Sequence, residues 1–148
     1  KWKQENLPLE TKSNGFKPVT FSGKINSGII SGFEHIHNNL DQLKILDARS
    51  DEEFHGKVIR AAHPGHVPNA INIDWNRNLN EDGTFKDDEE LSKLYDIPKN
   101  SEIVTYCQGA YRAANTFLVL KKLGFQNVRV YLGSWGEWGN RLDLPVEK

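Results

Sequence analysis

The chain has 148 residues, which is the length of one ordinary domain and too short for two full ones. Its 19 Lys and Arg against 20 Asp and Glu leave a formal charge of −1, which excludes the net basic field that would hold a nucleic acid or an anionic membrane. Apolar runs of only a few residues exclude a membrane-spanning helix, and a single cysteine excludes an internal disulfide and a cysteine-rich zinc or iron–sulfur site. One free thiol favours a reducing compartment, so we expect a cytoplasmic protein.

Residues 1–16 are expected to be a linker and the tail of a preceding domain. Trp2 followed by residues 7–10 (Leu-Pro-Leu-Glu) resembles Trp138 followed by residues 144–147 (Leu-Pro-Val-Glu). Such short matches also arise by chance; the alternative is that two similar domains end in the same way. Position 1 is Lys rather than Met, which favours a chain excised from a longer one.

Residues 17–148 alternate between strand-like and helix-like segments, beginning with a candidate edge strand over residues 18–21. Ser31 with Glu34 has the spacing of a capping box. Apolar residues then recur at helical spacing: Phe33, Ile36, Leu40 and Leu43.

A short buried strand is predicted over residues 44–47. Ser50 with Glu53 forms a second capping box, which opens a short helix that holds Phe54. Residues 57–69 carry Gly, Pro and His and are expected to form a loop.

The second half of the chain repeats this alternation. Strands are predicted over residues 70–73, 103–106 and 128–132. Helices are predicted at the acidic run 87–90, which follows a polar loop, over residues 112–123, and after a third capping box, Ser134 with Glu137. Carboxylates suit the positive end of a helix dipole, so the acidic run is interpreted as a cap rather than a metal site.

Strands that alternate with helices predict an α/β fold, in which a parallel sheet is covered by helices on both faces. In such sheets, ligands bind beyond the carboxyl ends of the strands. Asp47 comes just after Leu46, and Cys107 comes just after Tyr106. We therefore expect the functional site near Asp47 and Cys107.

The segment with the most chemistry is a six-residue loop between a predicted strand and a predicted helix: Cys107, Gln108, Gly109, Ala110, Tyr111 and Arg112. Its backbone N–H groups can turn inward as a nest for an anion, and the small Gly109 and Ala110 let a ligand approach the backbone. Arg112 can bind an oxyanion through two hydrogen bonds. A cysteine at a helix N-terminus beside a cation is expected to be largely thiolate at pH 7. A lone cysteine is more often a buried structural residue, but this context favours a nucleophile.

Two reaction classes use a loop of this kind. Phosphatases with a Cys-x5-Arg loop hold a tetrahedral phosphate, whereas the spacing here is Cys-x4-Arg. The residue before the cysteine is Tyr106, where many of those phosphatases have His. A tighter loop suits a smaller group, such as one sulfur atom carried on the cysteine.

Four segments together resemble the rhodanese family, and most closely the C-terminal, catalytic domain of a two-domain sulfurtransferase. These are residues 45–49 (Ile-Leu-Asp-Ala-Arg), 65–70 (Gly-His-Val-Pro-Asn-Ala), 107–112, and 133–138 (Gly-Ser-Trp-Gly-Glu-Trp). The resemblance covers residues 17–148 and departs from the family pattern at Asn69, where Gly is usual.

The resemblance implies a rhodanese-like sheet of about five strands and a ping-pong sulfur transfer that needs neither metal nor cofactor. Cys107 would take the outer sulfur of thiosulfate as a persulfide, and Gln108 to Arg112 would bind this small anionic donor. The sulfur would pass to cyanide in an assay, or to a thiol or protein acceptor. The resemblance also implies an upstream rhodanese-like domain.

Two departures bear on the donor. Mammalian members place basic residues directly after the cysteine, whereas this chain has Gln108 and Gly109, which leaves most of the local positive charge to Arg112. Members that use 3-mercaptopyruvate generally carry Arg at the position of Glu53, so the carboxylate there favours thiosulfate. Glu53 could equally be only the second half of its capping box. A mercaptopyruvate sulfurtransferase, and a sulfur-carrier or protein-interaction module, remain the alternatives.

The remaining candidate residues are expected to be structural. Asp47 and Arg49 would support the loop, by pairing with each other or by holding it, although a solvated turn is the alternative. His63 and His66 lack a third ligand, so no metal is expected there. The two tryptophans near the end of the chain, Trp135 and Trp138, are expected in the core.

Overall fold

The computed structural model describes residues 2–148, and its centre is a five-stranded sheet in which every pairing is parallel. The spatial order is β1-β5-β4-β2-β3. The strands are β1 (Ile30–Ser31), β2 (Lys44–Asp47), β3 (Ile71–Asn72), β4 (Ile103–Tyr106) and β5 (Val128–Tyr131). This confirms the predicted α/β fold with a parallel sheet.

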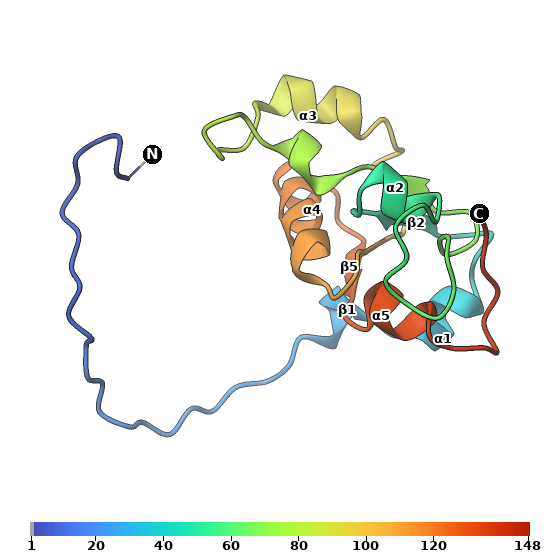
Figure 1. Ribbon diagram of the computed structural model, residues 1–148, viewed down its shortest axis with the longest axis horizontal. Helices are drawn as coiled ribbons and strands as arrows, with labels where there is room; N and C mark the ends of the chain where they lie inside the picture. The colour runs from blue at the N-terminus through green and yellow to red at the C-terminus, as the bar shows by residue number, and fades with distance from the viewer. Residues whose placement is uncertain (1) are drawn as a thin grey trace.

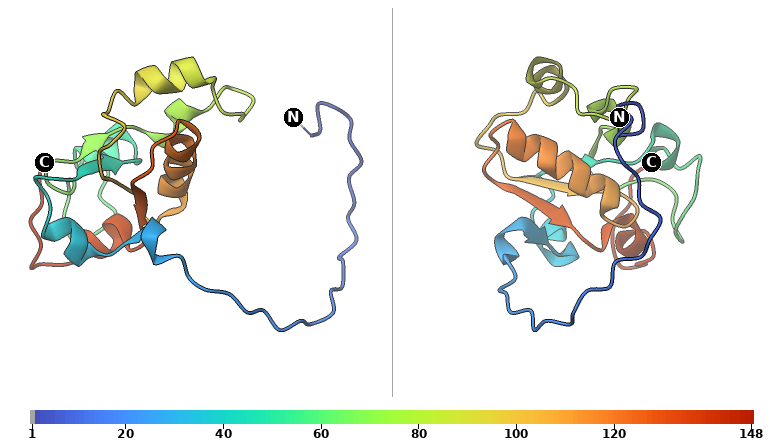
Figure 2. Two further views of the ribbon diagram at one scale, coloured as in Figure 1. Left: turned by 180° about the vertical axis from the view of Figure 1, so that it is seen from behind. Right: turned by 90° about the vertical axis from the view of Figure 1, so that its left-hand side faces the viewer.

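Helices cover both faces of the sheet, as predicted (Figures 1 and 2). One face packs against α1 (Phe33–His37) and α5 (Ser134–Trp138), and the other against α3 (Asp88–Leu94) and α4 (Tyr111–Lys122). The short α2 (Asp51–Phe54) follows β2. Neighbouring strand residues serve opposite faces, because side chains alternate along a strand: Ile45 packs with α1 and α5, whereas Leu46 packs with α3 and α4.

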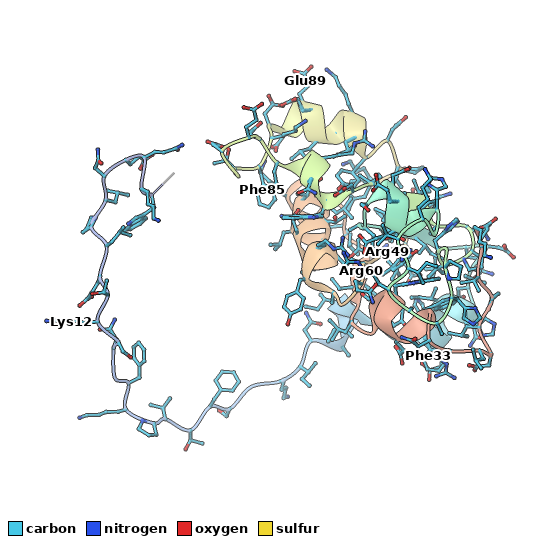
Figure 3. The ribbon with its side chains drawn as sticks, in the orientation of Figure 1. Lys12, Phe33, Arg49, Arg60, Phe85 and Glu89 are labelled. Carbon is cyan, nitrogen blue, oxygen red and sulfur yellow. The ribbon has the colours of Figure 1, made fainter. Side chains whose placement is uncertain are left out.

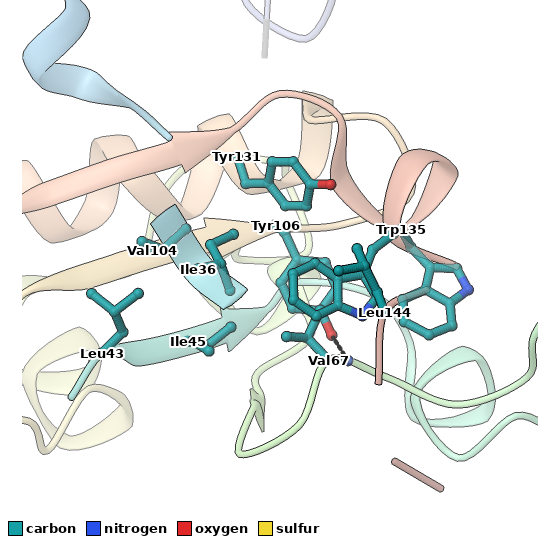
Figure 4. Packing of buried hydrophobic residues seen from close by; sticks show 10 residues of the cluster. Ile36, Leu43, Ile45, Val67, Val104, Tyr106, Tyr131, Trp135 and Leu144 are labelled. Atoms are coloured by element: carbon teal, nitrogen blue, oxygen red, sulfur yellow. Dashed lines mark hydrogen bonds between the residues drawn. The ribbon is translucent and has the colours of Figure 1, made fainter. Parts of the chain in front are cut away.

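The core between the sheet, α1 and α5 is rich in aromatic side chains. Trp135 and Trp138 are fully buried in it, as predicted, together with Tyr106 and Tyr131. Figure 4 shows this packing, with the Val67 N–H donating to the Tyr106 hydroxyl at 3.2 Å. The core therefore anchors the carboxyl ends of β4 and β5, where the loop of interest begins.

The segment before β1 leaves this body. Residues 2–26 contain no helix or strand, and a single 3-10 turn, η1 (Ser27–Ile29), leads into β1. Figure 3 labels Lys12 on this segment, well away from the helices. The predicted edge strand over residues 18–21 is therefore wrong. The position beside β5 is taken by β1, whose Ile30 and Ser31 register with Val130 and Tyr131.

Only one of the three predicted capping boxes forms. Ser50 and Glu53 make both reciprocal hydrogen bonds and begin α2. The Ser31–Glu34 box is wrong, because Ser31 belongs to β1 and Gly32 caps α1 without a side-chain bond. The Ser134–Glu137 box is also wrong, because α5 follows Gly133 and the Ser134 hydroxyl bonds elsewhere.

Other boundaries differ from prediction by small amounts. Helix α1 ends at His37, so Leu40 and Leu43 reach the core from the turns that follow it. Asp87 caps α3, which confirms the capping role of the acidic run. The strand predicted over 70–73 shortens to β3, and a 3-10 turn, η2 (Trp75–Asn78), was not predicted. Among the described residues, no helix is long and apolar enough to cross a membrane.

Candidate active site

The candidate site lies at the carboxyl ends of β2 and β4, which are neighbours in the sheet. Asp47 pairs in register with Tyr106, and the next N–H, of Ala48, donates to the Tyr106 carbonyl at 2.8 Å. The loop that begins at Cys107 therefore leaves the sheet beside the segment that follows Asp47. This juxtaposition is the one expected from the alternating pattern.

Cys107 sits at the base of the loop with 1% of its surface exposed. Its neighbours in a small apolar cluster are Ala48, Ala113 and Val130. Ala110 adopts a left-handed conformation with φ of 70° and caps α4. That conformation costs a residue with a side chain roughly 1–2 kcal/mol, so the surrounding bonds must hold the loop in this shape.

Ser134 supplies two of those bonds, although its spacing to Glu137 predicts a helix cap. Its hydroxyl oxygen accepts from the Cys107 N–H at 3.2 Å and the Ala110 N–H at 3.1 Å, and the hydroxyl donates to the Tyr131 carbonyl at 2.8 Å. The left-handed φ of 53° at Ser134 belongs to this turn. A single hydroxyl thus ties both ends of the tight part of the loop to β5.

The first turn of α5 holds the loop from the same side. The Trp135 N–H donates to the Cys107 carbonyl at 2.8 Å, and the Gly136 N–H donates to the Gln108 carbonyl at 2.9 Å. A side chain at Gly136 would come within 2.9 Å of that carbonyl, so glycine is required for this approach. The Gly-Ser-Trp segment is therefore a second wall of the site.

Several loop N–H groups are left available. Among the described residues, the amides of Gln108, Gly109 and Arg112 have no hydrogen-bond partner. They lie at the N-terminal end of the 12-residue α4, where the helix dipole favours negative charge. Gly109 is exposed, and Tyr111 points to solvent with 91% exposure. The loop therefore offers a backbone cradle suited to an anion next to Cys107.

Arg112 faces the same region but is not a free cation. Its Nη1 and Nη2 donate to the two carboxylate oxygens of Glu53 at 2.6 and 3.0 Å. These bonds with Glu53 raise the pKa of Arg112 against the opposing effect of burial, and its charge and hydrogen bonding with Cys107 raise it further. The guanidinium is therefore held by the Glu53 carboxylate and interacts electrostatically with the Cys107 thiol at the other end of the same loop.

Glu53 combines the two roles that the sequence left as alternatives. Its Oε2 accepts from the Ser50 N–H in the capping box, and its Oε1 lies 3.0 Å from the Nε of Arg60 in an ion pair. Burial would raise the pKa of Glu53, but the bonds with Arg112 and Ser50 hold it below its ordinary value. Glu53 is thus a buried anion shared by two arginines.

Arg60 was not predicted as a site residue. Its side chain is 58% exposed, and its carbonyl accepts from the Gln108 Nε2 at 3.2 Å. Figure 3 shows Arg60 on the same side of the molecule as Arg49 and α2. No signal in the sequence distinguished it, because the loop over residues 57–69 has no periodicity.

Asp47 and Arg49 form a separate pair that is fully buried, so the solvated-turn alternative is wrong. Arg49 donates to both oxygens of Asp47 at 2.6–3.0 Å and to the Gly65 carbonyl at 2.8 Å. Its guanidinium also stacks 4.5 Å over the ring of Trp135. The pKa of Arg49 rises because Asp47 outweighs the effect of burial. This pair therefore joins the carboxyl end of β2 to the loop that contains Gly65.

The two histidines of that loop take different positions. His66 is buried, stacks on Phe54 at 3.6 Å between ring centroids, and its Nδ1 lies 3.0 Å from the Phe54 carbonyl oxygen. His63 is half-buried. Across residues 2–148, no group of three or more potential metal ligands comes together.

Known proteins resemble this chain over nearly its whole length. Residues 33–141 match the family described as Rhodanese-like domain. A Mycobacterium leprae protein named "Putative thiosulfate sulfurtransferase" is 36% identical over 99% of this chain, and "Sulfur carrier protein TtuD" of Thermus thermophilus is 34% identical over all of it. The chain spans only 58% of the length of each of these two relatives.

Solved structures share the fold. The anaerobic ergothioneine biosynthesis enzyme of Chlorobium limicola, in complex with trimethyl histidine, superimposes with a TM-score of 0.90 at 21% identity. The match covers 99% of this chain and 39% of that enzyme. At this level of identity the likeness concerns the arrangement of the elements alone.

Proposed function

The chain belongs to the rhodanese family, and on this premise we propose that it is a sulfurtransferase that carries a sulfane sulfur as a persulfide on Cys107. The observation that carries the proposal is the loop after β4. Cys107 stands there beside unbonded N–H groups and the Arg112 guanidinium. Those groups can stabilise a thiolate, a persulfide and the oxygens of an anionic donor.

The sulfur transfer needs no oxidant or reductant besides the sulfur donor and the acceptor. The Cys107 thiolate attacks the outer sulfur of thiosulfate, a new S–S bond forms, and sulfite leaves with the electron pair of the broken S–S bond. An acceptor thiolate, or cyanide in an assay, then attacks the outer sulfur of the persulfide, and Cys107 leaves as the thiolate. The loop amides offset the negative charge on sulfur in both steps.

Thiosulfate is proposed as the preferred donor over 3-mercaptopyruvate. Thiosulfate brings its oxygens close to the transferred sulfur, where the loop amides and Arg112 converge. Mercaptopyruvate extends a carboxylate further out, where Glu53 already occupies Arg112 and Arg60 and would compete with it for their donors. Values of kcat/KM measured side by side test this, and a clear preference for mercaptopyruvate would contradict it.

The persulfide itself is the most direct test. Incubation with thiosulfate should add the mass of one sulfur atom to the protein, and peptide mapping should place it on Cys107. Cys107→Ser, which is nearly isosteric, should abolish both the added mass and thiosulfate:cyanide activity while the protein stays folded. Retained thiosulfate:cyanide activity in that variant would contradict the proposal. Brisk hydrolysis of an aryl phosphate would instead favour the phosphatase alternative.

A sulfur carrier is the second candidate function. It is supported by the 34% identical relative named as a sulfur carrier and by the 91% exposure of Tyr111, a large side chain beside the loop that a partner protein could cover. Single-turnover experiments separate the candidates. A carrier would form the persulfide from thiosulfate but pass its sulfur slowly to cyanide or small thiols, whereas an enzyme would turn over with both.

We also propose that residues 1–16 end a preceding, similar domain, to which residues 17–148 are joined. The indole N–H of Trp2 donates to the Pro8 carbonyl at 3.1 Å, and that of Trp138 donates to the Pro145 carbonyl at 2.8 Å. The same bond thus occurs at both copies of the motif, although Trp2 is 57% exposed and Trp138 is buried. This supports a repeated domain end, in which the core of the preceding domain would bury Trp2 as the present core buries Trp138.

The gene sequence upstream of Lys1 tests this directly. It should encode a rhodanese-like domain, and in the longer protein the fluorescence of Trp2 should become that of a buried indole. Separately, we propose a reducing, cytoplasmic location, which the single cysteine favours. A start codon within a few residues of Lys1 would refute the repeated domain.

A further inference from the structure

The Glu53 carboxylate is saturated by partners from three segments of the chain. Oε1 accepts from the Arg112 Nη2 at 3.0 Å and forms an ion pair with the Arg60 Nε, also at 3.0 Å. Oε2 accepts from the Arg112 Nη1 at 2.6 Å and from the Ser50 N–H at 3.2 Å. Glu53 is only 3% exposed, so its carboxylate is shielded from water although its arginine partners are partly exposed.

This arrangement exceeds what a helix cap requires. A capping box needs one acceptor oxygen directed at the N-cap N–H, and glutamine serves there as well as glutamate. The charge of Glu53 and its two-point hold on Arg112 are therefore additional to the cap. Cys107 and Arg112 stand at the two ends of the short loop between β4 and α4, and the Arg112 guanidinium interacts electrostatically with the thiol, so the partners of this guanidinium affect the charge near the reacting sulfur.

We infer that Glu53 is a positioning residue of the sulfur-transfer site, which fixes Arg112 against Cys107 and limits the positive charge that the sulfur and the bound anion experience. Two guanidiniums share one carboxylate, so this cluster keeps a single net positive charge. That single positive charge attracts an anionic donor. Because Glu53 keeps the charge from being larger, the anionic product can still leave. The inference rests on the proposed function for its meaning in catalysis.

Glu53→Gln is the first test, because glutamine keeps the cap and one acceptor for Arg112 but removes the negative charge. The pH midpoint for alkylation of Cys107 by iodoacetamide should fall, because the Arg112 charge near the thiol is no longer offset by a carboxylate. The kcat/KM for thiosulfate should rise roughly threefold to tenfold through a lower KM, while kcat does not rise. A residue with a merely structural role would move neither the pH midpoint nor KM in this direction.

Arg60→Ala provides a test of opposite sign. Arg60 is mostly exposed, so its loss should leave the fold intact while the full charge of Glu53 falls on Arg112. The alkylation midpoint should then rise, and KM for thiosulfate should increase. This variant keeps the inference testable even if Glu53→Gln folds poorly.

Ser50→Ala is the matched structural control. It removes the cap bond to the Glu53 N–H but leaves the carboxylate and both arginines in place. Helix α2 should be less stable, and the alkylation midpoint should stay at the wild-type value. If Ser50→Ala shifts the midpoint as Glu53→Gln does, or if neither Glu53→Gln nor Arg60→Ala shifts it, the inference is overturned.

Failure of the inference and failure of the proposed function give different results. Alkylation of Cys107 needs no sulfur transfer, so it reports on Glu53 even if thiosulfate is not a donor. Conversely, a wild-type protein that forms the Cys107 persulfide while Glu53→Gln leaves the midpoint unchanged would keep the proposed function and refute the positioning role.

Discussion

Two carboxylate–arginine groups stand at the carboxyl edge of the sheet, and they differ in what their arginines have left to offer. The side chains of the Asp47–Arg49 pair are at most 1% exposed. Arg49 donates hydrogen bonds to Asp47 and to the Gly65 carbonyl, and its guanidinium stacks on the ring of Trp135. In the other group, Arg112 and Arg60 are 26% and 58% exposed around a buried Glu53. In the first group the two charges balance and are closed off from solvent. In the second group the arginines still present donors to solvent and to Cys107.

The difference teaches that the same chemistry becomes structural or functional according to exposure and remaining hydrogen-bond capacity. A buried pair whose two charges balance holds segments together, and breaking it leaves an uncompensated charge in the core. A carboxylate shared by partly exposed arginines tolerates rearrangement, and its net positive charge can reach an incoming anion. We therefore expect the two groups to respond differently to equivalent substitutions.

The largest expected effect is on stability, at the buried pair. Asp47→Asn keeps the side-chain shape but leaves the Arg49 charge uncompensated in the core, so the free energy of unfolding should fall by about 3–5 kcal/mol. Glu53→Gln, the equivalent change in the other group, should cost clearly less, because its arginines can turn to water. Urea denaturation of both variants measures this. Equal losses would mean that the two groups do not differ as their exposure indicates.

The next effect is on activity, at the exposed group. Arg112→Ala should lower kcat/KM for thiosulfate by about 10–150-fold, or roughly 1.5–3 kcal/mol, the range for a charge-assisted hydrogen bond. Arg129→Ala is the control, because Arg129 is also paired with a carboxylate, Glu102 at 3.4 Å, but on β5 toward the amino ends of the strands, away from Cys107. An unchanged kcat/KM in Arg112→Ala would leave that residue as purely structural.

A third effect concerns the hydroxyl that holds the loop between the two groups. Ser134→Ala should leave the buried N–H groups of Cys107 and Ala110 without their acceptor, which costs about 1–3 kcal/mol of stability. Persulfide formation should slow as well, because the left-handed turn at Ala110 loses its support. Ser92→Ala, at an exposed position on α3, is the control and should change neither quantity.

The sequence pattern was sufficient for four of the five strands and for the position of Cys107 between β4 and α4. Buried β4 and amphipathic α4 follow hydrophobic periodicity, which depends on local residues, so the loop between them can be located from the amino-acid sequence alone. The pairing of β2 with β4, and hence the nearness of Asp47 to Cys107, follows from the general behaviour of parallel sheets.

The parts that pattern could not predict depend on contacts between distant segments. Ser-x-x-Glu has the same spacing at positions 50–53 and 134–137, yet only the first forms a cap, because Ser134 is drawn to the Cys107 loop 27 residues earlier. Arg60 reaches Glu53 from a loop without periodicity. The composition of residues 18–21 predicts a strand, but the position beside β5 is taken by β1 and these residues pair with no strand.

The smallest expected effect is a pH dependence that belongs to the exposed group. The folded-state pKa of Glu53 lies below its unfolded value of about 4.5, since Arg112 and Ser50 stabilise the carboxylate despite its burial. A group of this kind stabilises the fold above the unfolded pKa, and the stabilisation is lost as pH falls through the folded pKa. The free energy of unfolding should therefore decline below about pH 4.5, with Glu53 contributing a share of that decline. Urea titrations at pH 6, 4.5 and 3.5 should show a shallower decline in Glu53→Gln than in the wild type, because glutamine has no proton to gain. Parallel declines in the two proteins would show that Glu53 gains nothing from Arg112 in the folded state, and the distinction drawn between the two arginine groups would then rest on exposure alone.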